Sequence, residues 1–130
     1  MREVKGFDDT PYQWAAAGYS GAINSGNTIC GILFGSTAFL GFLHGNGKSS
    51  PPEVDDGQRI KAIETVNRLF KGFMEEFGTT DCRSLTHCDF SKKEEVDRFR
   101  QNEVYKHTCF KQFEFVLAYC LDHIKTRESL

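Results

Sequence analysis

The sequence predicts an all-α fold, a single-domain bundle of four to five helices with a buried, glycine-rich central helix. Three observations favour this fold class. Apolar residues recur at steps of three and four through residues 60–77, which is the spacing of one face of an α-helix. No stretch alternates between apolar and polar residues for long enough to predict a strand. A length of 130 residues fits one domain over residues 1–130.

Charge is distributed unevenly along the chain. Residues 1–9 form a polar N-terminal segment, whereas residues 10–47 contain no Asp, Glu, Lys or Arg. The apolar run 29–43 is shorter than the about 20 residues that cross a bilayer, so we expect a buried helix and no membrane span. A net charge of −2 argues against a nucleic-acid-binding surface built on positive charge.

Short local signals place the helices of the first half. The Thr10–Pro11 pair is typical of a helix start and predicts a short helix there. Glycine and serine within residues 18–26 predict a loose connection after it. Asn27 or Thr28 is then expected to cap the buried helix, which ends near Leu43.

The second half begins with an expected linker over residues 48–56, which contains two adjacent prolines. The clearest helix of the sequence follows and is ended by Gly78. Its predicted apolar face consists of Ile60, Ile63, Val66, Leu69, Phe70, Phe73 and Phe77.

Two more helices are expected toward the C-terminus. Ser91 and Glu94 have the spacing of a capping box for a short charged helix. The last helix is expected to start within residues 102–108 and to run to about Lys125. Its predicted apolar face consists of Cys109, Phe113, Val116, Cys120 and Ile124.

Five cysteines are many for a chain of this length. Their odd number, their wide spacing and an N-terminus without an apolar signal core argue against a secreted disulfide framework. We therefore expect reduced thiols and a cytoplasmic location. Because the sequence has no Cys-x-x-Cys-His motif, covalent haem is not expected. His44, His107 and His123 are expected to be solvated side chains rather than ligands.

Three of the cysteines follow helix-capping residues. Cys30, Cys82 and Cys109 each have a Thr or Asp one or two positions ahead, which predicts the first turn of a helix. Free amides and the helix dipole there favour the thiolate, which is the nucleophile and the metal ligand. The alternative is that these cysteines are small core residues, and the pattern favours neither interpretation. Cys120 is predicted to belong to the core.

Two further features suggest a metal site and an interface. Cys88 and His87 lie six and five residues after Cys82, and the three form a loosely spaced candidate metal site. Gly31 and Gly35 allow another helix to approach closely. This pair predicts either tight packing within the chain or a face on which two copies form a homodimer.

The stretch GYSGAINSGNTICGILFGSTAFLGFLHG resembles the glycine-rich core of the family named for its C-GCAxxG-C-C motifs. Residues 30–35 stand at the Cys-Gly-Ala-x-x-Gly motif, with Ile32 in place of the usual alanine. Residues 82–85, Cys-Arg-Ser-Leu, resemble the family's Cys-Arg-x-Leu. Cys109 resembles the last motif cysteine, with Phe110 in place of the usual proline. The resemblance covers about residues 11–124.

The resemblance implies a small bacterial or archaeal protein with redox activity, related to the split-Soret cytochromes; some members carry selenocysteine. Members begin with a further helix that bears the first motif cysteine, for which this sequence has no counterpart. If four cysteines form one site in relatives, Cys30, Cys82 and Cys109 supply three of them. Cys88, His87 or a residue of a second subunit would complete the site.

We therefore expect a redox-active or metal-binding protein with a redox partner protein. Cys30, Cys82 and Cys109 would carry out thiol redox chemistry or ligate an iron–sulfur cluster or zinc, and Gly31 and Gly35 are the candidate cofactor-binding glycines. The runner-up is a non-catalytic helical interaction module whose cysteines fill the core. A third hypothesis is noncovalent haem or another apolar cofactor between the uncharged helix and the phenylalanine face, with a histidine as ligand.

Overall fold

The computed structural model describes residues 12–45 and 56–129, and it confirms the all-α fold. Its described part contains seven helices, where four to five were expected, and the two shortest, α5 and α7, have only five and four residues. The polar segment 1–9, the Thr10–Pro11 cap and most of the expected linker lie outside the described residues. The helices are α2 (Tyr12–Asn24), α3 (Gly31–His44), α4 (Asp56–Phe77), α5 (Cys82–Thr86), α6 (Lys93–Gln101), α7 (Val104–His107) and α8 (Cys109–Glu128).

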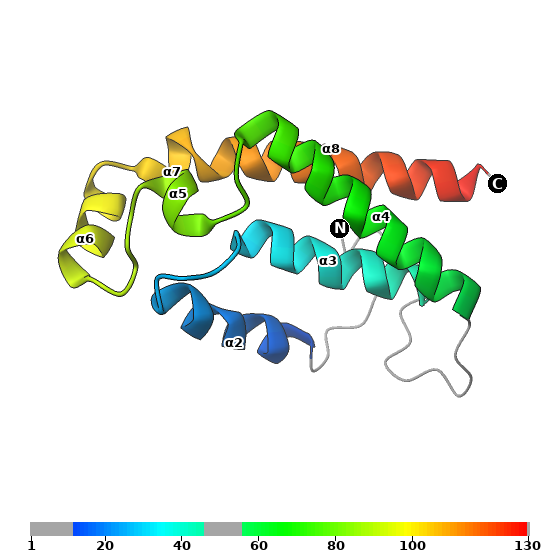
Figure 1. Ribbon diagram of the computed structural model, residues 1–130, viewed down its shortest axis with the longest axis horizontal. Coiled ribbons are helices and arrows are strands. Elements are labelled where there is room, and N and C mark those ends of the chain that lie inside the picture. Colours follow the sequence, from blue (N-terminus) through cyan, green and yellow to red (C-terminus); the bar gives the residue numbers. More distant parts are fainter. Residues whose placement is uncertain (1–11, 46–55, 130) are drawn as a thin grey trace.

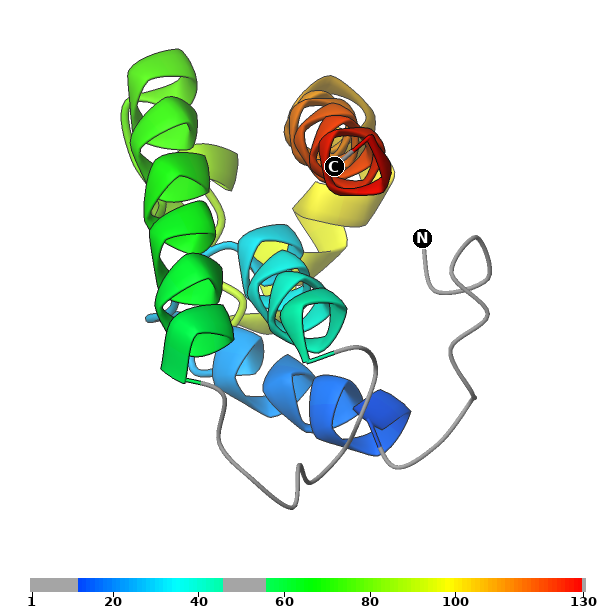
Figure 2. The same ribbon diagram turned by 90° about the vertical axis from the view of Figure 1, so that its right-hand side faces the viewer.

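Helix α3 contacts α2, α4 and α8, and Figure 2 shows it between these three helices when the molecule is viewed along its length. Figure 1 shows that α5, α6 and α7 gather at the end of the molecule where α3 and α8 begin. None of the described helices is long and apolar enough to cross a membrane.

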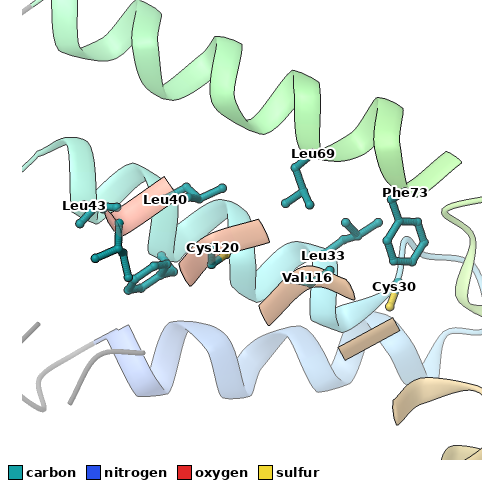
Figure 3. Close-up of a cluster of buried hydrophobic side chains, with 10 residues drawn as sticks. Cys30, Leu33, Leu40, Leu43, Leu69, Phe73, Val116 and Cys120 are labelled. Carbon is teal, nitrogen blue, oxygen red and sulfur yellow. The ribbon is translucent and has the colours of Figure 1, made fainter. Parts of the chain in front are cut away.

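The core lies where α3, α4 and α8 meet. Leu33 and Leu40 of α3, Leu69 and Phe73 of α4 and Val116 of α8 are almost completely shielded from solvent (Figure 3). These side chains fill the space between α3 and α4 in which the third hypothesis placed an apolar cofactor. Burial of a leucine or phenylalanine side chain contributes about 1.5–3 kcal/mol, so this contact region accounts for much of the packing energy.

The predicted apolar faces of the two long helices need correction. On α4, Ile60 and Ile63 are exposed, because α3 and α8 cover the helix mainly at and beyond Thr65. On α8, Phe113 is exposed and the preceding residue, Gln112, is buried. The buried residues of α8 recur at steps of four and are Gln112, Val116, Cys120 and Ile124.

Helix α2 is longer than predicted and runs through Gly18 and Gly21 to Asn24. Each glycine in a helix costs about 1 kcal/mol relative to alanine, so tertiary contacts must offset the cost. Tyr19 stacks on Phe34 of α3 with ring centroids 3.9 Å apart. Contact with α3 therefore extends the helix beyond what local propensity predicts.

Two predicted caps are also wrong. Helix α3 is preceded by Cys30 as its N-cap rather than by Asn27 or Thr28, because the segment around Ile29 pairs with the chain near Asp81 in an isolated antiparallel bridge. Helix α6 has Lys92 as its N-cap. The hydroxyl of Ser91, expected to cap α6, instead donates to Asp89 at 2.5 Å.

Candidate functional site

A short antiparallel contact brings the starts of α3 and α5 together. The Cys30 amide donates to the Thr80 carbonyl at 2.8 Å, and the Cys82 amide donates to the Thr28 carbonyl at 2.9 Å. Because side chains alternate across such a pair, Cys30 and Cys82 leave it on the same face as diagonal neighbours. Diagonal positions of this kind are about 7–8 Å apart. Two cysteines 52 positions apart in the sequence therefore become neighbours.

Helix α8 adds Cys109 to this pair. The Cys30 thiol donates a weak hydrogen bond to Oε1 of Gln112 at 3.8 Å, and Gln112 is only 2% exposed. Cys109 lies one helical turn before Gln112, and residues three apart share a helix face. The buried amide thus joins the first turn of α8 to the cap of α3. The three cysteines singled out in the sequence all lie at helix starts and meet at one end of the molecule.

Cys88 is a fourth member of this cluster. It is completely buried, and it follows His87, which ends α5 in the left-handed conformation at a φ of 53°. Electrostatic repulsion from Cys88 contributes to the pKa shifts of both Cys82 and Cys109. His87 itself is exposed and lines a cleft beside the cluster. From the sequence, Cys88 belongs only to a loosely spaced metal motif, because its place beside the other thiols depends on how the chain folds back after α5.

At these helix starts the thiol pKa values are raised rather than lowered. Burial raises the pKa of Cys30, although the amides of Ile32 and Leu33 oppose the shift. Burial, followed by repulsion from Cys30 and Cys109, raises the pKa of Cys82 to about 12. Burial and repulsion from Cys30 also raise the pKa of Cys109. Desolvation and crowding of like charges therefore outweigh the helix dipole, and at neutral pH the thiols are protonated.

Cys120 is separate from the cluster. It is fully buried among core side chains, as predicted, and Figure 3 shows it farther along α3 than Cys30. Burial raises the pKa of Cys120 to about 11, and no other thiol contributes to that shift. The chain thus provides an internal control, a buried cysteine without a cysteine neighbour.

A charged network that sequence reasoning missed supports the α5 side of the site. Asp89 is 8% exposed and pairs with Arg83 of α5 at 2.8 Å. Hydrogen bonds from Ser91, followed by the nearby Arg83 and Lys92 charges, lower the pKa of Asp89. Gly26 lies against this pair at a φ of +79°, and a Cβ there would be 2.3 Å from Oδ1 of Asp89. The only local signal was the glycine, which was interpreted as part of a loose connection.

An open cleft of about 350 Å³ lies beside the cluster. Ser84 and Leu85 of α5 form part of its wall, and Thr108 and Gln112 form the wall on the α8 side. Ser84 and Leu85 lie two and three positions after Cys82, and Thr108 directly precedes Cys109, so the cleft is lined by near sequence neighbours of both cysteines. His87, His107 and Lys111 supply the polar and basic part of its lining.

The two motif glycines differ in their surroundings. A Cβ at Gly31 would lie 2.9 Å from Cδ1 of Ile23, so this glycine permits close packing of α2 on α3. A Cβ at Gly35 would have no atom within 4 Å among the described residues. Close packing within the chain therefore explains Gly31 but not Gly35, and the homodimer stays a prediction.

In the described part of the chain, no three His, Cys, Asp or Glu side chains are placed to hold a metal ion. Of the Cys82, His87 and Cys88 combination, His87 lines the cleft and Cys88 is buried, and the metal site stays a prediction.

The fold and the site define a small all-α protein whose cysteines gather at the starts of its helices. The chain belongs to the family described as "Putative redox-active protein (C_GCAxxG_C_C)", whose model matches residues 1–123. This confirms the resemblance noted from the sequence motifs. Neither the curated proteins nor the solved structures contain a match to this chain.

Proposed function

We propose that the protein is a thiol–disulfide redox protein in which Cys30 and Cys82 form a reversible disulfide. The pairing of their backbone segments carries the proposal, because two hydrogen bonds fix the cysteines as diagonal neighbours. Cα atoms joined by a disulfide are about 4.4–6.8 Å apart, so a shift of about 1 Å would close the bond. Cys82 lies at the start of α5, a helix of only five residues.

The chemistry balances with a disulfide as the oxidant. The Cys82 sulfur, which is the more exposed of the two, attacks a disulfide of a small molecule or a protein, forming a mixed disulfide and releasing one thiol. The Cys30 sulfur then attacks the mixed disulfide and releases the second thiol. The site has lost two electrons and two protons, and the partner disulfide has become two thiols. Cys109 is the third thiol of the site. It follows Thr108, which lines the cleft, and it is the thiol from which a further exchange step can start.

The raised pKa values of Cys30, Cys82 and Cys109 support a site whose cysteines are neutral thiols in the reduced protein. Each thiolate that forms raises the cost of forming the next one, as the contribution of Cys30 to the pKa of Cys82 shows. Disulfide formation removes two of the crowded titratable groups. The same crowding would also be relieved by a cation, which makes metal binding the competing outcome to be tested.

Oxidation by glutathione disulfide without oxygen tests the proposal. Mass spectrometry should show that the wild type loses two hydrogen atoms and that the cross-linked peptides contain Cys30 and Cys82. Cys30→Ala and Cys82→Ala should stop at a glutathione adduct or remain reduced. Cys120→Ala is the matched control, since Cys120 is as buried as Cys30 but has no thiol neighbour, and it should oxidise like the wild type.

Three results would contradict the proposal. The first is a wild type that forms no intramolecular disulfide, which would favour the interaction module with cysteines as core residues. The second is a Cys120→Ala variant that fails in the same way as Cys30→Ala. The third is stoichiometric zinc or iron in protein purified without oxygen, bound through the cluster thiols and lost in Cys30→Ala.

The pH dependence of the reduction potential provides a second test. A two-electron, two-proton couple falls by about 59 mV per pH unit while both thiols remain protonated. For thiols of ordinary pKa this slope flattens above about pH 8.5. Because burial raises the pKa of Cys30 and of Cys82, the slope should continue beyond the pH at which it flattens for ordinary thiols. A break in the slope near pH 8.5 would show that the site thiols are not held protonated.

A further inference from the structure

A second cleft lies at the opposite end of the molecule from the cysteines. It has a volume of about 310 Å³ and is formed by His44 at the end of α3, by the first half of α4 and by the last turns of α8. Figure 1 shows that α3 and α8 both end on the side away from α5, α6 and α7. The proposed redox site does not involve this cleft, and no sequence motif predicts it.

The two histidines of the cleft are not the solvated side chains that the sequence predicted. His44 is 5% exposed, and its Nε2 lies 3.1 Å from Nε2 of His123. Nη1 of Arg127 lies 2.7 Å from Nδ1 of His44. A guanidinium can only donate, so Nδ1 of His44 accepts from Arg127. Oε1 of Gln58 lies 3.2 Å from the same Nδ1. Burial, together with the surrounding cations, lowers the pKa of His44 and of His123.

The permanent charges of the cleft are mostly positive. Lys61, Arg68 and Arg127 line it, against the single carboxylate of Glu64. With both histidines neutral, the net charge of the lining is plus two. Among the described residues none of these three cations forms an ion pair: Arg68 donates to the Thr65 hydroxyl at 3.2 Å and Arg127 donates to His44. Within the described residues, the two guanidiniums are thus held in place by neutral acceptors rather than by carboxylates.

We propose that this cleft binds the phosphate group of a small molecule. Two guanidiniums and a lysine match the oxygens of a phosphate, which arginine recognises through paired hydrogen bonds. A phosphate monoester carries a charge of about −1.5 to −2 at pH 7, which balances the lining better than one carboxylate would. A volume of about 310 Å³ exceeds that of the anion alone, so the phosphate is expected to be part of a larger molecule.

The paired histidines could also be interpreted as a metal site, but the positive charges of the cleft oppose that interpretation. Two Nε2 atoms 3.1 Å apart are close enough to share one divalent cation. Such an ion would face the side chains of Lys61, Arg68 and Arg127, with only Glu64 to compensate. Repulsion from three permanent cations therefore favours an anion over a metal ion.

Binding of the anion should be coupled to proton uptake. The groups that face the histidines are Lys61, Glu64 and Arg68 from α4 and Arg127 from α8. Nearby cations contribute to the lowered pKa of each histidine. A bound dianion neutralises these cations, so the pKa values of both histidines should rise on binding. This readout distinguishes binding in the cleft from binding elsewhere on the surface.

Titration with inorganic phosphate at constant ionic strength, followed by NMR of the histidine rings, tests the proposal. The signals of His44 and His123 should shift saturably and their pKa values should rise, while those of His87 and His107 should not. Arg68→Gln and Arg127→Gln should each weaken binding about tenfold or more. Arg59→Gln is the matched control, because Arg59 lies on α4 but outside the cleft and is ion-paired with Asp56.

Three outcomes would overturn the proposal. One is the absence of any saturable shift of His44 and His123 in the wild type, which needs no variant to fold. Another is equal weakening by Arg59→Gln and Arg127→Gln, which would indicate general ionic attraction. The third is stoichiometric binding of Zn²⁺ by His44 and His123 without binding of phosphate. None of these results depends on the cysteines, so the proposed redox function is tested separately.

Discussion

The reactivity of Cys82 toward disulfides should be low at neutral pH and should rise steeply in alkali. Its pKa is raised from 9.0 to about 12, which lowers the thiolate fraction at pH 8 about a thousandfold. A more basic thiolate is also a better nucleophile, with a Brønsted coefficient of about 0.4–0.5. The two effects together predict exchange about 50-fold slower than that of an ordinary exposed thiol, before any steric protection.

The assay is exchange with a small uncharged disulfide at pH 7–11, with the modified peptides resolved by mass spectrometry. The rate at Cys82 should rise about tenfold per pH unit without a plateau near pH 9. In urea the same cysteine should show an ordinary plateau, because burial and crowding are removed. Steric shielding alone would slow the reaction but leave the plateau near pH 9. A plateau there in the folded protein would refute the argument that desolvation and neighbouring thiols control this cysteine.

Three further predictions concern stability. The cluster thiols have raised pKa values in the folded state, so the unfolded state loses its thiol protons first as pH rises. The free energy of unfolding should therefore fall above about pH 9, which urea melts at pH 7–10 measure. The pKa values of His44 and His123 are lowered on folding, so the unfolded state binds protons first as pH falls. The free energy of unfolding should therefore fall below about pH 6.5, and an unchanged urea midpoint between pH 7 and 5 would contradict this. Gly26→Ala should destabilise the folded protein more than Gly78→Ala in thermal melts. Both glycines have a φ near +79°, where an alanine incurs strain of about 1–2 kcal/mol, but only at Gly26 would the added Cβ also collide with Asp89.

The long helices could be predicted because their apolar spacing repeats over several turns. The cores of α4 and α8 contain Leu69, Phe73, Val116 and Cys120, all of which the spacing identified. The apolar spacing does not determine where along a helix the buried part ends. Ile60 follows the same pattern as Leu69, but its exposure depends on where α3 and α8 stop covering α4, which is a property of the tertiary arrangement.

The candidate site was predictable in part for a similar reason. Capping residues locate Cys82 and Cys109 at helix starts by local rules, and the structure confirms both positions. The position of Cys30 as a cap depends on a bridge between segments 52 residues apart, for which no local signal exists. The neighbourhood of Cys88 and the pairing of His44 with another helix likewise depend on long-range packing. Sequence therefore identifies the chemical groups better than it identifies their partners.

The sign of the thiol pKa shifts follows from a competition between two known effects. A helix start favours a thiolate by an amount of about 0.3–1 kcal/mol at an exposed position. Desolvation of a buried thiol acts in the opposite direction and can exceed this several times. Burial is the largest cause of the raised pKa at Cys82 and at Cys109, and repulsion between neighbouring thiols adds to it. Burial also raises the pKa of Cys120, which has no thiol neighbour, so desolvation sets the sign of the shift and clustering reinforces it. A site of this kind should gain reactivity only when two of its thiols become a disulfide or when a partner displaces one of them toward solvent.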